Sequence, residues 1–458
     1  MTSAAAKPAF FTREPYFYKT IGRLMSVIVL QNLVAYSVNM ADNLMLGAYS
    51  QEALSGAATV NQIQFVLQQI VMAIGDSVVV LGSQYWGRRQ TGPIRQLALY
   101  ALLLCLVPGF GVFLWTSLAP ASVLSLFTSN ASYIAEGCAY LSLMRFTYPI
   151  YVLSTVLMAA LRTVETVGLS LHISLVSLVV NVGINYALIF GNFGCPEMGI
   201  RGAAVGTLVS RLLELVIVML YLLFQDKKLR LFGSGRIPFS APLFRDYFRV
   251  LLPSFLSNLL WSLATPIQTG VLGRLSDDAI AANSVSTTIF QYLKIVAMGE
   301  ASASSVLIGK TVGETSSDER LKSYTRTLQA LYLLIGAVLG AALYFLRVPF
   351  LRLYDLSPAA LETADGMLVV LSVVMVGMAY QMPVCVGIIK GGGDAAYMMY
   401  LNLISTWLIV MPLTFLGAFV WKLPAVWVVA ILNSDQIFKC FPAAIRVNRY
   451  RWIKRLAK

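Results

Sequence analysis

One carboxylate and a few polar side chains interrupt the apolar stretches of this 458-residue sequence. Asp42 lies inside the outer end of the first apolar stretch, where an unpaired carboxylate costs several kcal/mol. Asn181 and Asn185 are four positions apart and share one face of a helix, and Thr207 follows in the next apolar stretch. A carboxylate, two amide oxygens and a hydroxyl suit a proton or a hard monovalent cation such as Na⁺.

The three neutral residues have a second interpretation. Polar side chains in membrane helices often hydrogen-bond to a neighbouring helix and simply hold the two together. The spacing does not show that the stretches carrying Asp42, Asn181 and Thr207 meet, so at this point both interpretations stand.

Other ionisable and aromatic residues in the apolar stretches are secondary candidates for lining a cavity. An ionisable residue at membrane depth needs a partner or water, and aromatic faces bind organic cations. These candidates are Asp76, Lys294, Glu300, Tyr36, Trp261, Tyr292 and Tyr380. Any single aromatic residue is more simply explained as part of the core or of an interfacial belt.

Two pairs of opposite charge are spaced to meet within one helix. Arg211 and Glu214 are three positions apart, and Asp435 and Lys439 are four positions apart. Side chains at these spacings are neighbours on a helix surface, so we expect two internal ion pairs that let charged helices enter the membrane.

The elements that position these residues are predicted to be membrane spans. The sequence is 58% hydrophobic and 12% charged, with a mean hydropathy of +0.74, which is far too apolar for a soluble globular protein. Cutting the apolar runs at about 20 residues each predicts twelve transmembrane helices in an all-α polytopic membrane protein. They are expected near 21–46, 59–82, 95–118, 134–160, 168–190, 202–224, 248–272, 285–308, 325–346, 363–388, 397–418 and 424–446.

The net charge of +13 is distributed as expected for a membrane topology. Most Lys and Arg residues of the loops fall on one side of the predicted membrane. The opposite side holds Arg201, Arg274, Arg347, Arg352 and Lys422. Basic loops stay in the cytoplasm, so we expect a multi-pass protein of the plasma (cytoplasmic, inner) membrane with both termini cytoplasmic. The basic excess therefore indicates topology, not a nucleic-acid partner.

The two halves of the chain resemble a repeat. Shifting the sequence on itself superposes the first two spans on spans seven and eight, so that Leu46–Gly47 falls on Leu272–Gly273. Asp42 falls on Gln268, and the acid therefore belongs to the first half only. Parallel repeats of six spans are a transporter architecture with the substrate path between them. We expect an N-terminal six-helix lobe over 1–224, a cytoplasmic linker over 225–247, and a C-terminal six-helix lobe with a basic cytoplasmic tail over 248–458.

Enzyme chemistry is not indicated by the residues present. Five scattered cysteines and the single His172 provide neither a metal cluster nor a disulfide framework. The KGGGD stretch at 390–394 lacks the spacing of a phosphate-binding loop and predicts a tight cytoplasmic turn. With no ATP-binding motif and no cofactor expected, an ion gradient would have to drive any active transport.

Several motifs in register resemble the multidrug and toxin extrusion (MATE) family over essentially the whole chain. DNLMLGAYSQEALSGAA is similar to the family's exit from the first span, and LRTVETVG and IKGGGDAAYMM resemble its paired motifs after spans four and ten. NVGINYALIFG followed by GIRGAAVGTLVSR is similar to its motif in spans five and six.

This resemblance implies two six-helix lobes around a central cavity. It also implies antiport, in which amphipathic and often cationic drugs or metabolites leave the cell in exchange for H⁺ or Na⁺. The first-lobe cation site of the family falls on Asp42, Asn181, Asn185 and Thr207. An Asp found in many members is Asn185 here, so Asp42 would be the only carboxylate of that site.

One alternative function and several further expectations accompany this prediction. A lipid-linked-precursor flippase of the related superfamily is the main alternative and would favour a basic cavity. Some members of the family have a cation site in the second lobe, formed by two acidic residues. The corresponding positions in this sequence are Trp261 and the region of Tyr380, and Glu300 could take the place of the missing acids. The expected partners are a small-molecule substrate and membrane lipid, and the protein is expected to be a monomer.

Overall fold

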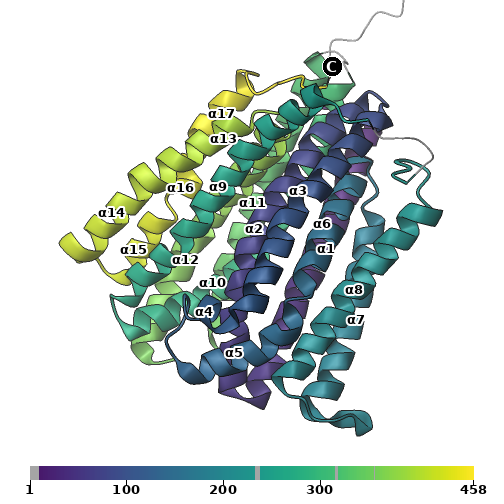
Figure 1. The fold of residues 1–458 in the computed structure, drawn as a ribbon. Coiled ribbons are helices and arrows are strands. Elements are labelled where there is room, and N and C mark those ends of the chain that lie inside the picture. The colour runs from purple at the N-terminus through teal and green to yellow at the C-terminus, as the bar shows by residue number, and fades with distance from the viewer. Residues whose placement is uncertain (1–9, 233–237, 315–317, 355, 458) are drawn as a thin grey trace, which may run out of the picture. The chain divides into compact units, whose positions relative to one another are not determined.

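The structure is a computed structural model that describes residues 10–232, 238–314, 318–354 and 356–457, and every regular element in these ranges is helical. Figure 1 shows the helices with the labels used below. In the first half of the chain they are α1 (Pro15–Tyr49), α2 (Gln51–Gly87), α3 (Thr91–Leu118), α4 (Pro120–Leu124), α5 (Ala131–Met144), α6 (Thr147–Thr163), α7 (Gly168–Phe190), the short η1 (Asn192–Gly194) and α8 (Ile200–Phe224).

The second half contains longer helices followed by segmented ones. They are α9 (Ala241–Gly273), α10 (Asp277–Gly313), α11 (Asp318–Leu351), α12 (Pro358–Met382), η2 (Pro383–Lys390), α13 (Ala395–Asn402), η3 (Leu403–Val410), α14 (Met411–Phe415), η4 (Leu416–Val420), α15 (Ala425–Leu432), α16 (Asp435–Phe438) and α17 (Cys440–Asn448).

The predicted all-α membrane fold is confirmed. Ten of the helical segments are long and apolar enough to cross a membrane, and α5 with α6 forms one more span that bends by 54°. The remaining predicted span, 285–308, lies inside the 37-residue helix α10, which is long enough to cross a membrane but is not apolar enough to be counted among these ten. All twelve predicted spans therefore correspond to helical segments.

Several spans differ from the straight helices that the sequence predicts. The span predicted at 134–160 breaks between Met144 and Thr147, because Pro149 cannot donate its backbone nitrogen to the carbonyl of Arg145. Three π-helical segments, η2, η3 and η4, lie in the spans predicted at 363–388 and 397–418. The last span is interrupted at Asn433–Ser434, between α15 and α16.

The chain divides into two compact units. Unit 1 consists of Met1–Val29, Ser83–Arg88 and Leu252–Lys458, and unit 2 consists of Leu30–Gly82 and Arg89–Leu251. Helices α1, α2 and α9 each contribute residues to both units. The lobe boundaries expected at 224 and 248 stay a prediction.

Unit 2 contains the residues that the sequence singled out first. Within it α7 packs along α8, α3 packs along α6, and both α5 and α6 contact α8. Figure 1 shows α7 and α8 side by side, so a residue on the inner face of one can reach the other.

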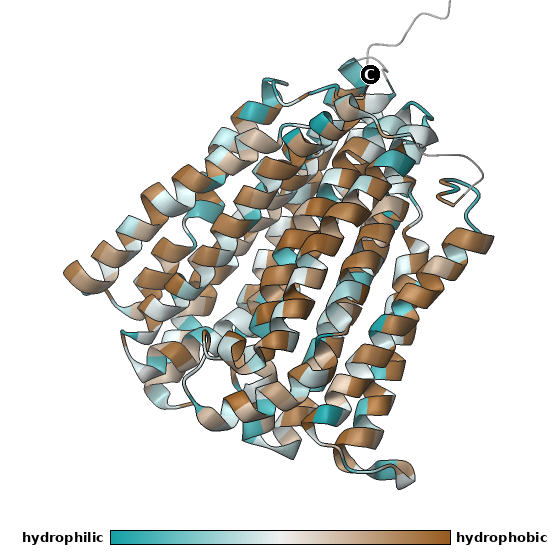
Figure 2. Ribbon diagram, viewed as in Figure 1, coloured by the Kyte–Doolittle hydropathy of each residue, from teal (hydrophilic) through white to brown (hydrophobic). Residues whose placement is uncertain are grey.

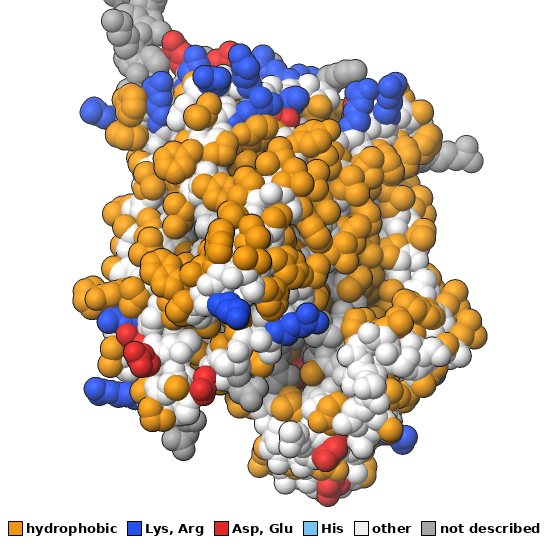
Figure 3. Space-filling view, turned by 90° about the vertical axis from the view of Figure 1, so that its left-hand side faces the viewer, with side chains coloured by type: hydrophobic (Ala, Val, Ile, Leu, Met, Phe, Trp, Pro, Cys, Tyr) orange, Lys and Arg blue, Asp and Glu red, His pale blue; other side chains and the backbone are white. Residues whose placement is uncertain are grey.

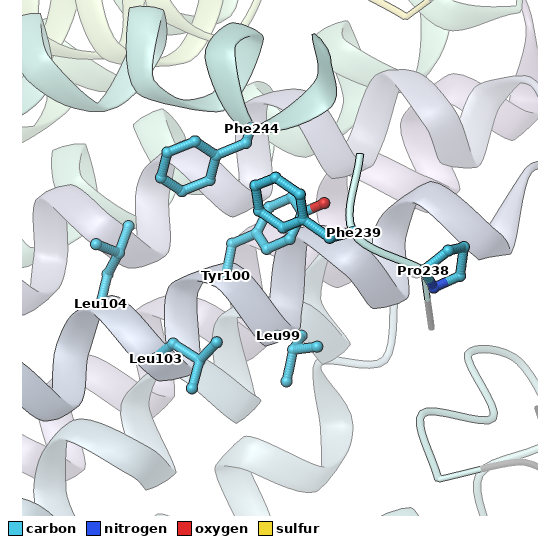
Figure 4. Close-up of a pocket in the computed structure, with 7 residues that line it drawn as sticks. All are labelled: Leu99, Tyr100, Leu103, Leu104, Pro238, Phe239 and Phe244. Carbon is cyan, nitrogen blue, oxygen red and sulfur yellow. The ribbon is translucent and has the colours of Figure 1, made fainter. Parts of the chain in front are cut away.

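The linker that follows α8 is fastened to α3 inside unit 2. The Tyr100 hydroxyl accepts a hydrogen bond from the Ser240 nitrogen (2.7 Å), and the Tyr100 ring packs edge-on against Phe239 and Phe244, each at 5.4 Å. These rings border an apolar pocket of about 340 Å³ (Figure 4), which is lined by Leu99, Tyr100, Leu103, Leu104, Pro238, Phe239 and Phe244. Residues of the linker form part of its wall, and the lining has no carboxylate or amine that could bind a coupling ion.

Unit 1 anchors the C-terminal tail on the KGGGD stretch. Trp452 is fully buried, and a Cβ at Gly392 would collide with its ring, so only glycine lets the ring lie there. The Lys454 nitrogen donates to the Gly392 carbonyl (2.9 Å), and the Gln84 side chain accepts from the Leu456 nitrogen (2.9 Å). The C-terminal tail therefore packs on the predicted turn.

The N-terminal segment is held in the same unit by Glu14. Arg320 donates to its carboxylate at 2.7 Å and so does the Tyr324 hydroxyl, also at 2.7 Å. Partial burial works against the charge of Glu14, but the hydrogen bonds from Arg320 and Tyr324 and the Arg320 charge outweigh it and lower the pKa of Glu14 below its ordinary 4.5.

The surface matches a protein that lies in a bilayer. The helices are apolar along most of their length, while hydrophilic residues are concentrated toward the connecting turns (Figure 2). Hydrophobic side chains cover the middle of the face in Figure 3, and Lys and Arg gather along its upper edge. Such a band of apolar side chains bounded by basic residues is typical of membrane proteins.

Candidate functional site

The structure brings Asp42 and the two asparagines together inside unit 2. Nδ2 of Asn185, on α7, donates to Oδ1 of Asp42, on α1, at 2.5 Å, and also to Oδ1 of Asn181 at 3.3 Å. Asn181 is 1% exposed and Asn185 is fully buried, whereas Asp42 is partly exposed. The carboxylate is therefore held from one side by a buried amide and remains open to an incoming ion.

Three polar atoms around this hydrogen bond are buried without a hydrogen-bond partner among the residues that the structure describes. They are Asn181 Nδ2, Asn185 Oδ1 and Thr207 Oγ1. The Thr207 hydroxyl, on α8, faces the buried phenol of Tyr140 without making a hydrogen bond of normal geometry. A buried polar atom with no partner is costly, so this arrangement has unused capacity to bind something.

A glycine on α8 makes room for the asparagine. A Cβ at Gly206 would collide with Oδ1 of Asn185 and touch the carbonyl of Asn181 at 3.4 Å. The two helices approach closely because glycine has no side chain at this point. Gly206 was not predicted as a site residue, although the small residues of GAAVGT in a membrane span are typical of a close helix contact.

The charges next to the site do not cancel. Arg211 NH1 lies 2.9 Å from Glu214 Oε2, which confirms the predicted ion pair on α8. The Arg211 guanidinium also lies over the Tyr151 ring, 5.2 Å from its centroid, and within electrostatic range of Asp42. Two carboxylates and one guanidinium leave one negative charge in this part of unit 2. One monovalent cation would neutralise it.

Neither the approach of Arg211 to Asp42 nor that of Tyr140 was predicted. Both depend on how α5 and α8 pack against α7 and α1, and no spacing within one helix contains that information. Arg211 was assigned only to its pair with Glu214. Tyr140, on α5, is 3% exposed and lies within electrostatic range of Asp42.

The residues present fit a monovalent cation better than a transition metal. Among the residues that the structure describes, no group of three His, Cys, Asp or Glu side chains could hold a metal ion. Asp42 and the oxygens of Asn181, Asn185 and Thr207 form an all-oxygen set, which hard cations prefer. Asn185 would have to turn its amide to present Oδ1, because Nδ2 now faces the carboxylate.

The secondary candidates are dispersed over both units. In unit 2, Asp76 lies within electrostatic range of Arg162 on α6, and Tyr36 is 39% exposed. In unit 1, the Lys294 ammonium lies over the Trp261 ring, 5.3 Å from its centroid. Tyr292 is partly exposed on the same helix as Lys294.

Two further candidates in unit 1 lie in buried surroundings. The Tyr380 hydroxyl donates to Oε1 of Gln329 at 2.8 Å. Glu300 is fully buried, and neither of its carboxylate oxygens has a hydrogen-bond partner among the described residues. Glu300 stays a secondary candidate for a proton-carrying group.

A model of the MatE family matches residues 28–187 and 253–416, which is more than half of the chain and covers both halves of the repeat. The chain is 25% identical over 446 residues to the probable multidrug resistance protein NorM of Thermotoga maritima, covering 96% of this chain and 94% of that protein. It is 27% identical over 424 residues to the probable multidrug resistance protein NorM of Xylella fastidiosa, covering 89% and 87%.

Solved structures show the same fold. A crystal structure of MATE in the straight conformation superposes with a TM-score of 0.85 at 17% identity, covering 98% of this chain and 99% of that one. A transporter of the MOP superfamily from Pyrococcus furiosus superposes with a TM-score of 0.83 at 17% identity, covering 97% and 99%. This multi-pass membrane protein therefore belongs to the MatE family, the multidrug and toxin extrusion transporters.

Proposed function

We propose that this protein is a secondary antiporter that exports amphipathic, cationic drugs or metabolites in exchange for H⁺ or Na⁺, and that Asp42 carries the coupling ion. The observation that carries the proposal is the partly exposed Asp42 carboxylate, which accepts a hydrogen bond from a buried amide and carries the one uncompensated negative charge of this part of unit 2. Such a group at membrane depth is functional by default. No catalytic residue and no cofactor other than the coupling ion belongs to this proposal.

The coupling ion changes the bond between α1 and α7. When Asp42 is free and charged, it accepts the charge-assisted hydrogen bond from Asn185, which is about twice as strong as a neutral one. A proton on Asp42 removes the charge and weakens this bond. A sodium ion would instead bind the carboxylate together with oxygens of Asn181, Asn185 and Thr207, which requires the Asn185 amide to turn.

This change at one residue can bias the whole transporter. Helix α1 contributes Pro15–Val29 to unit 1 and Leu30–Tyr49 to unit 2, and Asp42 lies on the second part. A ligand shifts a conformational equilibrium by its difference in affinity for the two states. Cation binding would therefore favour one arrangement of α1, and substrate binding to the free carboxylate would favour the other.

The uncompensated negative charge at Asp42 also favours a cationic substrate. A cation and a coupling ion that both neutralise this charge compete, and competition for one site gives exchange. The relatives from Thermotoga maritima and Xylella fastidiosa carry the name multidrug resistance protein, which supports amphipathic drugs as substrates.

A lipid-linked-precursor flippase is the alternative, and the charges disfavour it. For the Pyrococcus furiosus transporter, reversed polarity of the binding pocket suggests a different function, so polarity is informative among proteins of this fold. A flippase would need exposed basic groups at membrane depth. Two basic side chains at membrane depth are paired here, Arg211 with Glu214 and Lys439 with Asp435, and a third, Lys294, lies over the Trp261 ring.

The proposal includes the setting of the protein. The bias of Lys and Arg toward one side supports the plasma (inner) membrane with both termini in the cytoplasm. The proposal also takes the protein to be a monomer that works surrounded by membrane lipid.

Transport into proteoliposomes with the Na⁺ and pH gradients imposed separately tests this function. A fluorescent organic cation should accumulate against its gradient when one of the two ions is supplied, and should not accumulate with neither. Accumulation that requires ATP, or equal accumulation with no gradient, would exclude antiport.

A further inference from the structure

The end of α2 crosses the end of α10 at a pair of glycines, which we call the glycine crossing. A Cβ at Gly87, on α2, would collide with the backbone carbonyl of Lys310, on α10. A Cβ at Gly313, on α10, would collide with the backbone carbonyl of Gln84, on α2. Two helices can approach this closely only where they carry no side chain. The two backbones are therefore in direct contact at the crossing.

The glycine crossing has the symmetry of the internal repeat. The shift that superposes the first span on span seven also superposes the residues of this contact. The superposed pairs are Gln84 with Lys310 and Gly87 with Gly313. Each glycine thus meets the carbonyl of the residue three positions before the other glycine, as in a contact around a twofold axis. The side chains break this symmetry, because a glutamine in one repeat corresponds to a lysine in the other.

The C-terminal tail binds the side chain of Gln84 at this crossing. Gln84 is fully buried, and its Nε2 donates to the carbonyl of Lys454 at 3.1 Å. Its Oε1 accepts from the backbone nitrogens of Leu456 at 2.9 Å and Ala457 at 3.3 Å. Both ends of the amide are thus bound by the backbone of the tail. A buried amide that lost these partners would be costly, so the end of α2 and the tail stabilise each other.

The tail is also fastened to other elements of unit 1. Trp452 is fully buried against Gly392, as described above. Lys454 Nζ lies 3.4 Å from Oδ1 of Asp394, and Arg455 donates to Oδ1 of Asp318, the first residue of α11, at 2.8 Å. The tail therefore connects the end of α2 to the KGGGD stretch and to α11.

Helix α2 belongs to both units. Its residues 51–82 belong to unit 2, where a Cβ at Gly82 would press against Thr163, and its residues 83–87 belong to unit 1. The helix is continuous across this boundary and contains no proline. Transporters built from parallel repeats alternate access by moving one repeat against the other. A rearrangement of the two units must therefore either bend α2 or release its end from α10.

We propose that the tail, residues 452–457, is a latch that holds the end of α2 on α10 and opens in each transport cycle. The Gln84 side chain is bound by the tail and its carbonyl lies against Gly313, so the latch and the glycine crossing open together. The inference rests on the protein being a transporter, but it does not depend on antiport or on the identity of the coupling ion.

Amide hydrogen exchange of the purified protein in lipid nanodiscs tests whether the tail depends on Gln84. Gln84→Leu nearly keeps the size of the side chain and removes its hydrogen bonds. Exchange at Leu456 and Ala457 should therefore become at least about fivefold faster, the factor that corresponds to about 1 kcal/mol. Gln68→Leu, at an exposed position of the same helix, is the control and should leave that rate unchanged. Equal rates in Gln84→Leu and the unmodified protein would overturn the proposal.

A second variant tests whether the tail and the glycine crossing open together. The new Cβ of Gly313→Ala would push the backbone of Gln84 away from α10, so the amides of the tail should again exchange at least about fivefold faster. Gly270→Ala, on α9 with open space around it, is the matched control and should exchange like the unmodified protein. If Gly313→Ala leaves the tail as protected as before, the two contacts are independent and the latch is refuted.

A reversible cross-link tests whether the latch opens during transport. Gln84→Cys and Leu456→Cys are combined and joined by a short bifunctional maleimide that contains a disulfide, and counterflow exchange of ethidium is measured in proteoliposomes. The linked protein should exchange at least about tenfold more slowly, since a conformational step it needs is blocked. Reduction should restore the rate, and each single variant treated with the same reagent should keep it.

Exchange by the linked protein at the rate of the reduced protein would show that α2 bends while its end stays in place, and the proposal would be wrong. The hydrogen-exchange measurements need no substrate, so they decide on the latch independently of ethidium. Counterflow needs no ion gradient. An unmodified protein that exchanges ethidium but never accumulates it would therefore refute the antiport function and leave the latch intact.

Discussion

Replacing Asp42 by asparagine should abolish gradient-driven accumulation and leave the fold intact. The substitution keeps the shape of the side chain, and its Oδ1 can still accept from Asn185 Nδ2. Exchanging a charge-assisted hydrogen bond for a neutral one costs about 1 kcal/mol, and removing an uncompensated charge offsets part of it. We therefore expect the free energy of unfolding to change by less than about 1 kcal/mol.

The expected loss of accumulation follows from the charge count. Asp42, Glu214 and Arg211 together carry one uncompensated negative charge, which implies one cation exchanged there per substrate. A gradient of one pH unit, or a tenfold Na⁺ gradient, is worth about 1.4 kcal/mol per ion and supports about a tenfold concentration ratio of substrate. In Asp42→Asn, ion exchange at this site should no longer support any substrate gradient, so its contribution to the concentration ratio should fall from about ten to one.

The assay is substrate accumulation at steady state in proteoliposomes, with the membrane potential held at zero. The ratio is plotted against the imposed gradient for the unmodified protein and for Asp42→Asn. Counterflow exchange of labelled against unlabelled substrate, with no gradient, is the control for a functional carrier and should persist in the variant. A variant that accumulates substrate as steeply as the unmodified protein would refute the coupling role of Asp42.

Three further predictions test the surroundings of the site and the fold. Gly206→Ala should displace Asn185 and reduce coupled transport at least about tenfold, whereas Gly183→Ala, on the facing helix with open space around it, should transport normally. Glu214→Gln removes the partner of Arg211, whose charge can then neutralise Asp42. The concentration of coupling ion for half-maximal transport should therefore rise at least about tenfold. An unchanged concentration would contradict the charge count. Glu14→Gln should lower stability by less than about 1 kcal/mol at neutral pH, because this carboxylate is 42% exposed. The folded pKa of Glu14 is lowered, so its stabilisation is present above 4.5 and is lost as the pH falls through the folded value. Thermal unfolding curves of the two proteins should therefore converge in acid, and a constant difference would show that the carboxylate charge is irrelevant.

The membrane spans could be predicted because length and composition decide them. About 20 apolar residues span a bilayer wherever they occur, and all twelve predicted stretches are helical. The break at Phe146 was not predicted, since it depends on Pro149 acting on one backbone carbonyl inside a stretch of uniform composition. The interruption at Asn433–Ser434 is of the same kind.

The candidate site could be predicted only as far as spacing and family motifs reach. The i, i+4 spacing puts Asn181 and Asn185 on one face, and in the structure Asn185 donates both to Asp42 and to Asn181. The position of Arg211 and the need for Gly206 come from the packing of α8 against α7, which one sequence does not encode in a readable pattern. The packing of the Trp452 ring against Gly392 was not predicted, for the same reason.

The central claim is that Asp42 holds one coupling ion that substrate displaces. Calorimetric titration of the purified protein with substrate, in buffers of different ionisation enthalpy and at fixed Na⁺, counts the protons released per substrate bound, and a sodium electrode counts Na⁺. The account predicts release of one ion, H⁺ or Na⁺, by the unmodified protein and one fewer by Asp42→Asn. An equal number released by both proteins would contradict it.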